Sequence, residues 1–251
     1  MATNPNGQER EDQASPRKAR PRIHWGKFFV EFLSIFIAVL SAFALNNWND
    51  NRKSRHAETN ILKEVSNGFR LDSADVALNI MGHEYGVKAA IYFRKLIRNE
   101  TIDIDSLAAY KRILIRDFIS IQNTSGYESL KSQGLDIVTS DTLRLEIISM
   151  YEYNYKLIEK IEEQYAAQQF FERYSDRFND AIASQIVFDE EGGIKSISLP
   201  LKLSSKEKNR LLLDLRAIEE DRRFTLRFYY TIAEQLESTR NLIDEELRQR
   251  A

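Results

Sequence analysis

The longest continuous hydrophobic stretch lies near the amino terminus, where Phe28 to Leu45 contains a single charged side chain, Glu31. Its length suits an α-helix that crosses the hydrocarbon core of a bilayer. Trp25 and Trp48 are the only tryptophans of the chain, and they flank this stretch about 35 Å apart along a helix axis. Because tryptophan is enriched at both membrane interfaces, we predict a transmembrane helix over residues 23–49 with Trp25 and Trp48 as its interface anchors.

The segment before the span, residues 1–22, is polar and rich in proline, so we expect a disordered tail. A cleaved signal peptide is the alternative, because Ala42-Phe43-Ala44 resembles a small-residue cleavage site. The distance of that site from the first residue, the long apolar stretch and Glu31 inside it all favour a retained anchor.

The basic residues near the span predict its orientation. Six Lys or Arg side chains precede the apolar stretch and four follow it: Arg10, Arg17, Lys18, Arg20, Arg22 and Lys27, then Arg52, Lys53, Arg55 and Lys63. Because cytoplasmic flanks carry the excess of basic residues, this small bias predicts that the amino terminus lies in the cytoplasm and the large domain on the other side of the membrane.

One face of the predicted span carries small and polar residues, whereas the opposite face is rich in phenylalanine. The first face consists of Glu31, Ser34, Ala38, Ser41 and Ala42. Small residues spaced by four let two membrane helices approach closely, so this face predicts association of the span with a second membrane helix. Two alternatives stay open: the spacing arises by chance, or Glu31 reaches the interface or pairs with Lys27.

The rest of the chain has a helical pattern. No proline occurs between Pro21 and Pro200, and strand-rich folds of this size need frequent turn residues. Apolar residues recur at helical spacing to about Arg98, which predicts that the membrane helix continues into the next unit. We therefore predict an all-α fold, in which the N-terminal transmembrane helix continues into an elongated antiparallel helical bundle over residues 50–251.

Four further helices are expected in this bundle. Asp105 caps a short helix that reaches Ile121, and Thr124 and Gly134 bound another. Ser140 begins a long helix that reaches Ile182. After a break between Val187 and Leu203, Ser204 and Glu207 form a capping box that begins the last helix.

The last helix has a near-heptad apolar pattern typical of a coiled coil. Arg222, Thr225 and Thr239 interrupt it. These interruptions suggest a seam that one chain does not fill, and therefore self-association of the bundle.

Composition limits the chemistry. The chain holds 36 basic and 38 acidic residues, which excludes the one-signed field of a nucleic-acid-binding protein. Cysteine is absent and the three histidines lack the Glu-x-x-His spacing of di-iron bundles. Neither a Gly-x-Ser-x-Gly sequence nor a glycine-rich phosphate loop is present. We therefore expect no catalytic residue, no metal site, no cofactor and no enzyme.

A polar turn at Tyr127 to Gly134 interrupts the helical pattern. As a functional surface, Tyr127, Glu128 and Lys131 would contact a partner or a ligand. In the structural alternative, which we favour, Tyr127 and Leu130 fill the bundle and Gly134 ends a helix.

Two segments resemble a known family. The first is Glu31, the apolar stretch to Leu45 and then Asn46-Asn47-Trp48-Asn49-Asp50-Asn51-Arg52-Lys53; the second is Gly126-Tyr127-Glu128-Ser129-Leu130-Lys131-Ser132-Gln133-Gly134 with Leu143-Arg144 before Tyr151. Together they are similar to an uncharacterised bacterial family of single-pass membrane proteins, catalogued as domain of unknown function 6090. The resemblance implies a location in the bacterial inner membrane, which with the predicted orientation places the large domain in the periplasm, and it implies a helical fold. It implies no activity, substrate or catalytic residue.

Two functions fit these observations. The first is a membrane-anchored interaction or scaffold module of the cell envelope, whose partners are the lipid bilayer and a second copy of the chain or another envelope protein. The second is an extracytoplasmic sensor-like domain that binds a small molecule between its helices and signals through a partner subunit. We favour the interaction module because the sequence before the span is short for an output domain.

Overall fold

The computed structural model describes residues 25–250, so the predicted tail over residues 1–22 lies outside the described residues. The described chain is almost entirely helical, which confirms the all-α prediction. It divides into two units, one through Arg52 and one from Lys53 onward.

The first unit is the initial part of helix α1 (Trp25–Ile97). An 18-residue window of this helix has a mean hydropathy of 2.4, and none of it is buried by the rest of the chain. The segment is therefore apolar and long enough to cross a membrane. From Lys53 onward α1 belongs to the second unit, and from Ala57 it alternates buried with exposed positions.

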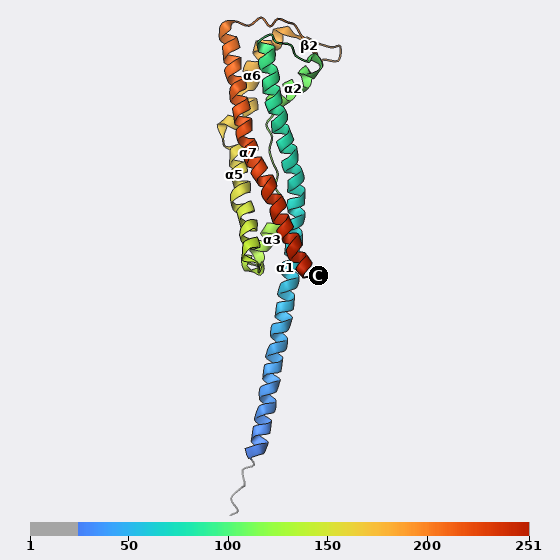
Figure 1. Cartoon of the computed structure of the whole chain (residues 1–251), viewed down its shortest axis with the longest axis vertical. Coiled ribbons are helices and arrows are strands. Elements are labelled where there is room, and N and C mark those ends of the chain that lie inside the picture. The colour runs from blue at the N-terminus through green and yellow to red at the C-terminus, as the bar shows by residue number, and fades with distance from the viewer. Residues whose placement is uncertain (1–24, 251) are drawn as a thin grey trace, which may run out of the picture. The chain divides into compact units, whose positions relative to one another are not determined.

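In the second unit, α1 packs antiparallel against α7 (Ser205–Gln249) (Figure 1). Arg94 near the end of α1 pairs with Glu219 at 2.5 Å, whereas Arg250 after the end of α7 pairs with Glu58 at 2.5 Å. The apolar positions of the near-heptad pattern in α7 are mostly buried: Leu211, Leu215, Ile218, Tyr229, Ile232, Leu236 and Ile243 are buried, and Leu247 is partly buried. The predicted capping box of Ser204 and Glu207 is confirmed.

The predicted long helix from Ser140 to Ile182 is wrong, because the chain forms three pieces instead. They are α4 (Asp141–Ser149), which continues through a π-helical turn (Met150–Asn154) into α5 (Tyr155–Glu163), and α6 (Phe170–Ile182) after a short 3-10 turn (Ala166–Gln168). The side chain of Asp117 accepts hydrogen bonds from the N–H groups of Phe170 (2.8 Å) and Phe171 (3.4 Å) and so begins α6. Phe171, at the start of α6, is 62% exposed, although the apolar spacing of the predicted long helix would place it among the buried residues.

Two shorter helices connect α1 to α4. A 3-10 turn (Ile104–Ser106) precedes α2 (Leu107–Leu114), and α3 (Ser125–Gln133) is followed by a second 3-10 turn (Leu135–Ile137). The predicted cap at Asp105 is wrong, because Asp103 accepts the hydrogen bond from the Asp105 N–H. The helix also ends at Leu114 instead of reaching Ile121.

Glycine permits two features of α3. Gly134, which follows the helix as predicted, has a φ of +98°, a value that side chains rarely adopt. At Gly126 a Cβ atom would lie only 2.8 Å from the backbone nitrogen of Val65. Glycine at this position therefore lets α3 approach the backbone of α1.

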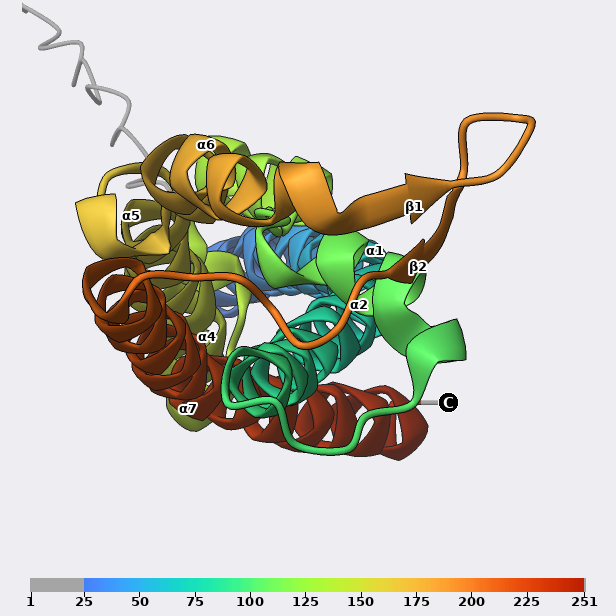
Figure 2. The ribbon, with the colours of Figure 1, turned by 90° about the horizontal axis from the view of Figure 1, so that it is seen from above.

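The predicted break after α6 contains a small antiparallel hairpin (Figure 2). After a 3-10 turn (Ala183–Gln185), strand β1 (Ile186–Phe188) pairs with β2 (Ile194–Ile197). Ile186 lies opposite Ile197, and a register irregularity follows Val187.

The bundle has two apolar cores. The first joins α1 residues 61–76 to α3, α4, α5 and α7 residues 229–243; the second joins α1 residues 89–97 to α2, α6, β2 and α7 residues 211–218. Between these stretches of α1 and α7 lie buried polar side chains, which we call the polar layer: Asn79, His83, Glu162, Arg222 and Thr225. Burial of polar groups costs free energy unless they find hydrogen-bond partners. The polar layer is therefore a candidate functional site, and the partners of its side chains are described below.

Candidate functional site

The predicted membrane-association residues lie on the part of α1, residues 26–56, in which every side chain is exposed. Glu31, Ser34, Ala38, Ser41 and Ala42 are all exposed, and the Ser34 hydroxyl donates to the Glu31 carbonyl at 2.8 Å. Trp48 is 58% exposed and the guanidinium of Arg52 lies 5.7 Å from its ring centre. Trp25 is the first residue of α1. The described chain therefore offers this surface to lipid or to another molecule.

The predicted surface at Tyr127, Glu128 and Lys131 separates into a buried and an exposed part. Tyr127 is only 3% exposed and stacks on Tyr151 at a ring separation of 4.4 Å, and its hydroxyl donates to Glu152 at 3.0 Å. Burial and the neighbouring carboxylate raise the pKa of Tyr127 to about 12. On the surface, Glu128 and Lys131 form an ion pair at 2.7 Å.

These residues line a small cavity of about 160 Å³ that also touches Tyr155 and Lys156. Sites for drug-sized ligands are larger, about 300–1,000 Å³. Leu130 is fully buried beside Tyr127, as the structural alternative expected. The cavity has room for a few water molecules or a small ion.

Two larger clefts occur near the other end of the bundle. One of about 510 Å³ is lined by Arg177, Ser204, Glu207 and Arg210, and one of about 380 Å³ by Lys88, Tyr92, Lys95 and Tyr110, among others. In the larger cleft, Arg177 pairs with Asp214 at 2.6 Å and the Ser204–Glu207 capping box is complete. Arg177, Arg210 and Glu207 of this cleft thus already have partners within the chain.

The sequence pattern did not reveal the extended segment over residues 115–124, which connects α2 to α3. Carboxylates from distant helices accept hydrogen bonds from its N–H groups. Glu162 accepts from Ser120 at 3.0 Å, Asp75 from Ile121 at 3.1 Å and Asp72 from Asn123 at 2.8 Å. These side chains replace the backbone partners that a helix or a sheet would supply.

Two of these carboxylates are buried and have hydroxyl partners. Tyr155 donates to Asp72 at 2.6 Å, and Tyr229 donates to Glu162. Burial raises the pKa of both Asp72 and Glu162, although the hydrogen bonds that each accepts oppose this effect. Both carboxyl groups are fully engaged with the extended segment and with tyrosine.

Arg222 is the centre of the polar layer and is completely buried. Its Nη2 atom donates to the carbonyl oxygens of Ile113 (3.3 Å), Leu114 (3.0 Å) and Arg116 (2.8 Å), at the carboxyl end of α2. A cation suits this place, because a helix carboxyl end carries partial negative charge. Burial lowers the pKa of Arg222 to about 9, which leaves the side chain charged at neutral pH.

Aromatic rings and a histidine complete the surroundings of this guanidinium. It lies 4.1 Å from the ring centre of Phe170 and 5.5 Å from that of Phe118. Arg222 Nη1 lies 3.4 Å from Nδ1 of His83, which is only 2% exposed. Burial and the charge of Arg222 lower the pKa of His83 to about 3, so the histidine is neutral. A Cβ atom at Gly86 would collide with Arg222, so glycine there makes room for it.

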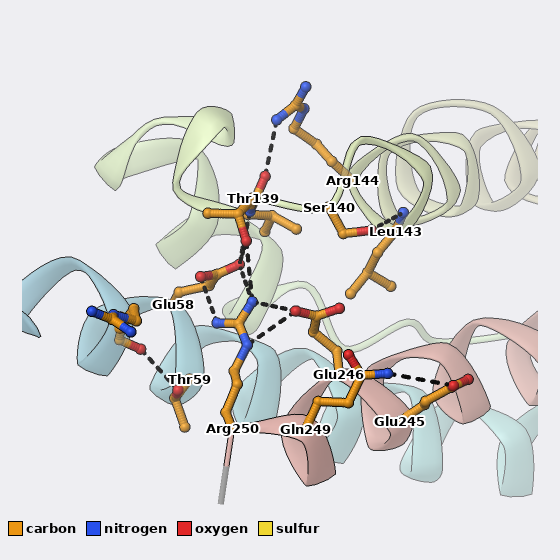
Figure 3. Close-up of polar contacts among 12 residues, drawn as sticks. Glu58, Thr59, Thr139, Ser140, Leu143, Arg144, Glu245, Glu246, Gln249 and Arg250 are labelled. Carbon is orange, nitrogen blue, oxygen red and sulfur yellow. Dashed lines mark hydrogen bonds and ion pairs between the residues drawn. The ribbon is translucent and has the colours of Figure 1, made fainter. Parts of the chain in front are cut away.

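Glu58, Glu246 and Arg250 form a group of ion pairs at the carboxyl end of α7 (Figure 3). Glu58, only 1% exposed, accepts from the Thr139 N–H at 2.7 Å and pairs with Arg250 at 2.5 Å. Arg250 also pairs with Glu246 at 2.6 Å. Burial alone would raise the pKa of Glu58, but the hydrogen bonds from Arg250 and Thr139 lower it. These contacts connect three parts of the bundle: α1, the end of α7, and the loop that precedes α4.

Glu58, Asp72, Glu162 and Arg222 thus bind backbone groups of other segments of the bundle. Arg222, Thr225 and Thr239 are buried inside the chain, so they do not indicate an unfilled seam in α7. Across residues 25–250, no group of three or more histidine, aspartate or glutamate side chains lies close enough to hold a metal ion.

Comparison with models of known families, with curated proteins and with solved structures found no match for this chain. The family resemblance at the span and at Gly126 to Gly134 therefore stays a prediction.

Proposed function

We propose that this chain is a single-pass, membrane-anchored helical interaction or scaffold module of the bacterial cell envelope and that it catalyses no reaction. The observation that carries the proposal is the exposed apolar surface of residues 28–45. Its large apolar side chains are 42–71% exposed. Burial of one such side chain is worth about 1.5–3 kcal/mol, so a lipid environment supplies a stabilisation that the described chain does not provide.

The arrangement of charge in the second unit also supports a scaffold. Glu58, Asp72, Glu162 and Arg222 are buried and bind backbone groups of segments that carry no helix or strand at those points. Such groups give a bundle one fixed arrangement of its helices. A fixed arrangement suits a protein that presents helix faces to a partner.

The sensor-like alternative has less support. The cavity at Tyr127 is small, and in the larger cleft both arginines, Arg177 and Arg210, already pair with Asp214. The interaction module requires only the exposed surfaces that the structure presents, so we retain it as the proposed function.

Charged substitutions in the centre of the span test the anchor. Ile37→Arg combined with Leu40→Arg is expected to move the protein from carbonate-washed membranes to the soluble or aggregated fraction. Each arginine disfavours insertion of a helix centre by about 2.5–3.5 kcal/mol. Asn49→Arg, at the flank, is the control and is expected to leave the protein in the membrane. Retention of the double variant at the level of the control would refute the anchor.

Orientation has its own test. In spheroplasts, added protease is expected to degrade the domain after Asn51 and to leave a tag at the amino terminus protected, because six basic residues precede the span and four follow it. Lysed spheroplasts provide the control in which both parts are accessible. A protected domain with an accessible tag would reverse the orientation.

A further inference from the structure

We propose that an exposed apolar face of α1 is a dimer seam that pairs in parallel with the same face of a second copy of this chain. The face, which we call the α1 seam, consists of Leu71, Ala74, Leu78, Met81 and Tyr85. The proposal names a partner for the interaction module, and its parallel orientation rests on the proposed function, because two copies anchored in one membrane by the same span run in the same direction.

The α1 seam is apolar, exposed and regularly spaced. Leu71 is 48%, Leu78 61%, Met81 47% and Tyr85 45% exposed, and Ala74 is exposed as well. Steps of three, four, three and four residues place these side chains on one helix face in the a and d positions of a heptad. Isolated exposed apolar residues need no explanation, but a row with this spacing is typical of helix pairing.

The chain itself covers the neighbouring faces of α1 and leaves the seam open. Val76, in the first apolar core, and Val87 are 5% and 6% exposed. Along another edge runs the extended segment, whose Phe118 ring lies against Gly82 and whose Ile121 N–H donates to Asp75. The Ile121 side chain is 75% exposed, so the segment adds apolar surface beside α1.

Charge complementarity favours a second copy as the occupant. With Leu71 at an a position, Arg70 falls at g and Asp75 at e, and a parallel pair brings each g residue to the e residue five positions later in the other chain. Arg70 of one copy thus meets Asp75 of the other, twice in a symmetric dimer. Arg70 makes none of the hydrogen bonds or ion pairs found within residues 25–250, and Asp75 uses its Oδ2 atom to hold Ile121.

The seam has defined ends and a modest area. In the heptad before the seam, Glu64 and Asn67 occupy the a and d positions, and Lys88 occupies the d position after it. Polar residues therefore end the seam on both sides. A stable interface buries about 800 Å² on each partner, more than five side chains over about four helical turns provide. Membrane anchoring raises the effective concentration of the two copies, which lets so short a seam pair.

Cysteine crosslinking in native membranes tests the seam, because the full chain contains no cysteine. Leu71→Cys and Met81→Cys, introduced separately, are each expected to give a same-residue disulfide dimer under mild oxidation. These positions lie about 15 Å apart along the helix, so an antiparallel pair would bring at most one of them against itself. Leu213→Cys, on the exposed side of α7 (66% exposed), is the control and should stay monomeric.

The charge pair gives a second, matched test. Arg70→Glu, combined with Met81→Cys, is expected to reduce the disulfide dimer at least fivefold. Lys63→Glu is the control, because Lys63 occupies the g position one heptad earlier and the residue five positions later is Gly68. An equal effect of both charge reversals, or a crosslink at one of the two seam positions only, would overturn the seam.

Fractionation of the same cells separates this proposal from the function on which it rests. A chain that stays in carbonate-washed membranes but crosslinks no better than Leu213→Cys refutes the α1 seam alone. A chain that leaves the membrane while still forming both crosslinks refutes the anchor alone.

Discussion

Arg222→Met is expected to lower the free energy of unfolding of the bundle by about 3 kcal/mol. The substitution retains an unbranched chain of similar length but removes the donor to three carbonyl oxygens at the end of α2. Buried acceptors without partners cost about 1–3 kcal/mol each, and this loss outweighs the gain from no longer burying a charge. Burial lowers the pKa of Arg222 to about 9, which is still above neutral, so the side chain is charged at neutral pH.

Urea unfolding of the full chain in detergent micelles, followed by far-ultraviolet circular dichroism, measures this loss. Arg216→Met is the matched control on the same helix, since Arg216 is 61% exposed and makes only a surface pair with Glu220. We expect the control to change the free energy of unfolding by less than about 0.5 kcal/mol. Equal stability of the two variants would contradict the role assigned to Arg222.

His83 is expected to make the bundle less stable as the pH falls below about 6. The pKa of His83 is 6.5 in the unfolded chain and about 3 in the folded chain. Between these values the unfolded state binds a proton that the folded state does not, so its contribution to stability is present above pH 6.5 and is lost as the pH falls. The contribution of His83 to the free energy of unfolding should therefore decrease by about 1.4 kcal/mol per pH unit below pH 6.

The variant His83→Gln isolates this contribution, because glutamine does not titrate. Burial raises the pKa of Asp72 and Glu162, so these carboxyls act in the opposite direction, but they do so in both proteins. Urea unfolding at pH 7 and pH 5 gives the free energy of unfolding of both proteins. The value for the native chain, relative to that for His83→Gln, is therefore expected to be lower at pH 5 than at pH 7. His56→Gln, at an exposed position, is the matched substitution against which the effect of His83→Gln is compared. A pH-independent difference for His83→Gln would refute the buried neutral histidine.

The sequence pattern predicted the elements whose signals are local. The apolar spacing of α1 and α7, the capping box at Ser204 and the positive-φ glycine at Gly134 depend on residues a few positions apart. Each is settled by helix geometry or by backbone sterics. For this reason the all-α fold and the ends of these helices followed from the sequence.

The missed features depend on distant side chains. The chain stays extended at Ser120 and Asn123 because Glu162 and Asp72 accept their N–H groups across sequence separations of 42 and 51 residues. Likewise Asp117 begins α6 from a separation of 53 residues. Apolar spacing continued through both places, so the pattern predicted helix where tertiary hydrogen bonds stabilise another conformation.

The polar residues of α7 were misinterpreted for a similar reason. Arg222 and Thr225 interrupt the heptad, which suggested a seam left open to a second chain. In the structure both are fully buried, and Arg222 caps α2 instead. A single sequence shows that a polar residue falls on an apolar face, but not that three carbonyl oxygens surround it. The exposed row on α1 was missed as well, because its apolar residues are indistinguishable in the pattern from those of the core.

The mass of the protein recovered from membranes tests the central claim most directly, namely that residues 28–45 are a retained anchor. We expect the full-length chain, with its amino-terminal segment intact, to remain in carbonate-washed membranes. A soluble mature chain that begins at Leu45, as cleavage after Ala44 would produce, would contradict the account.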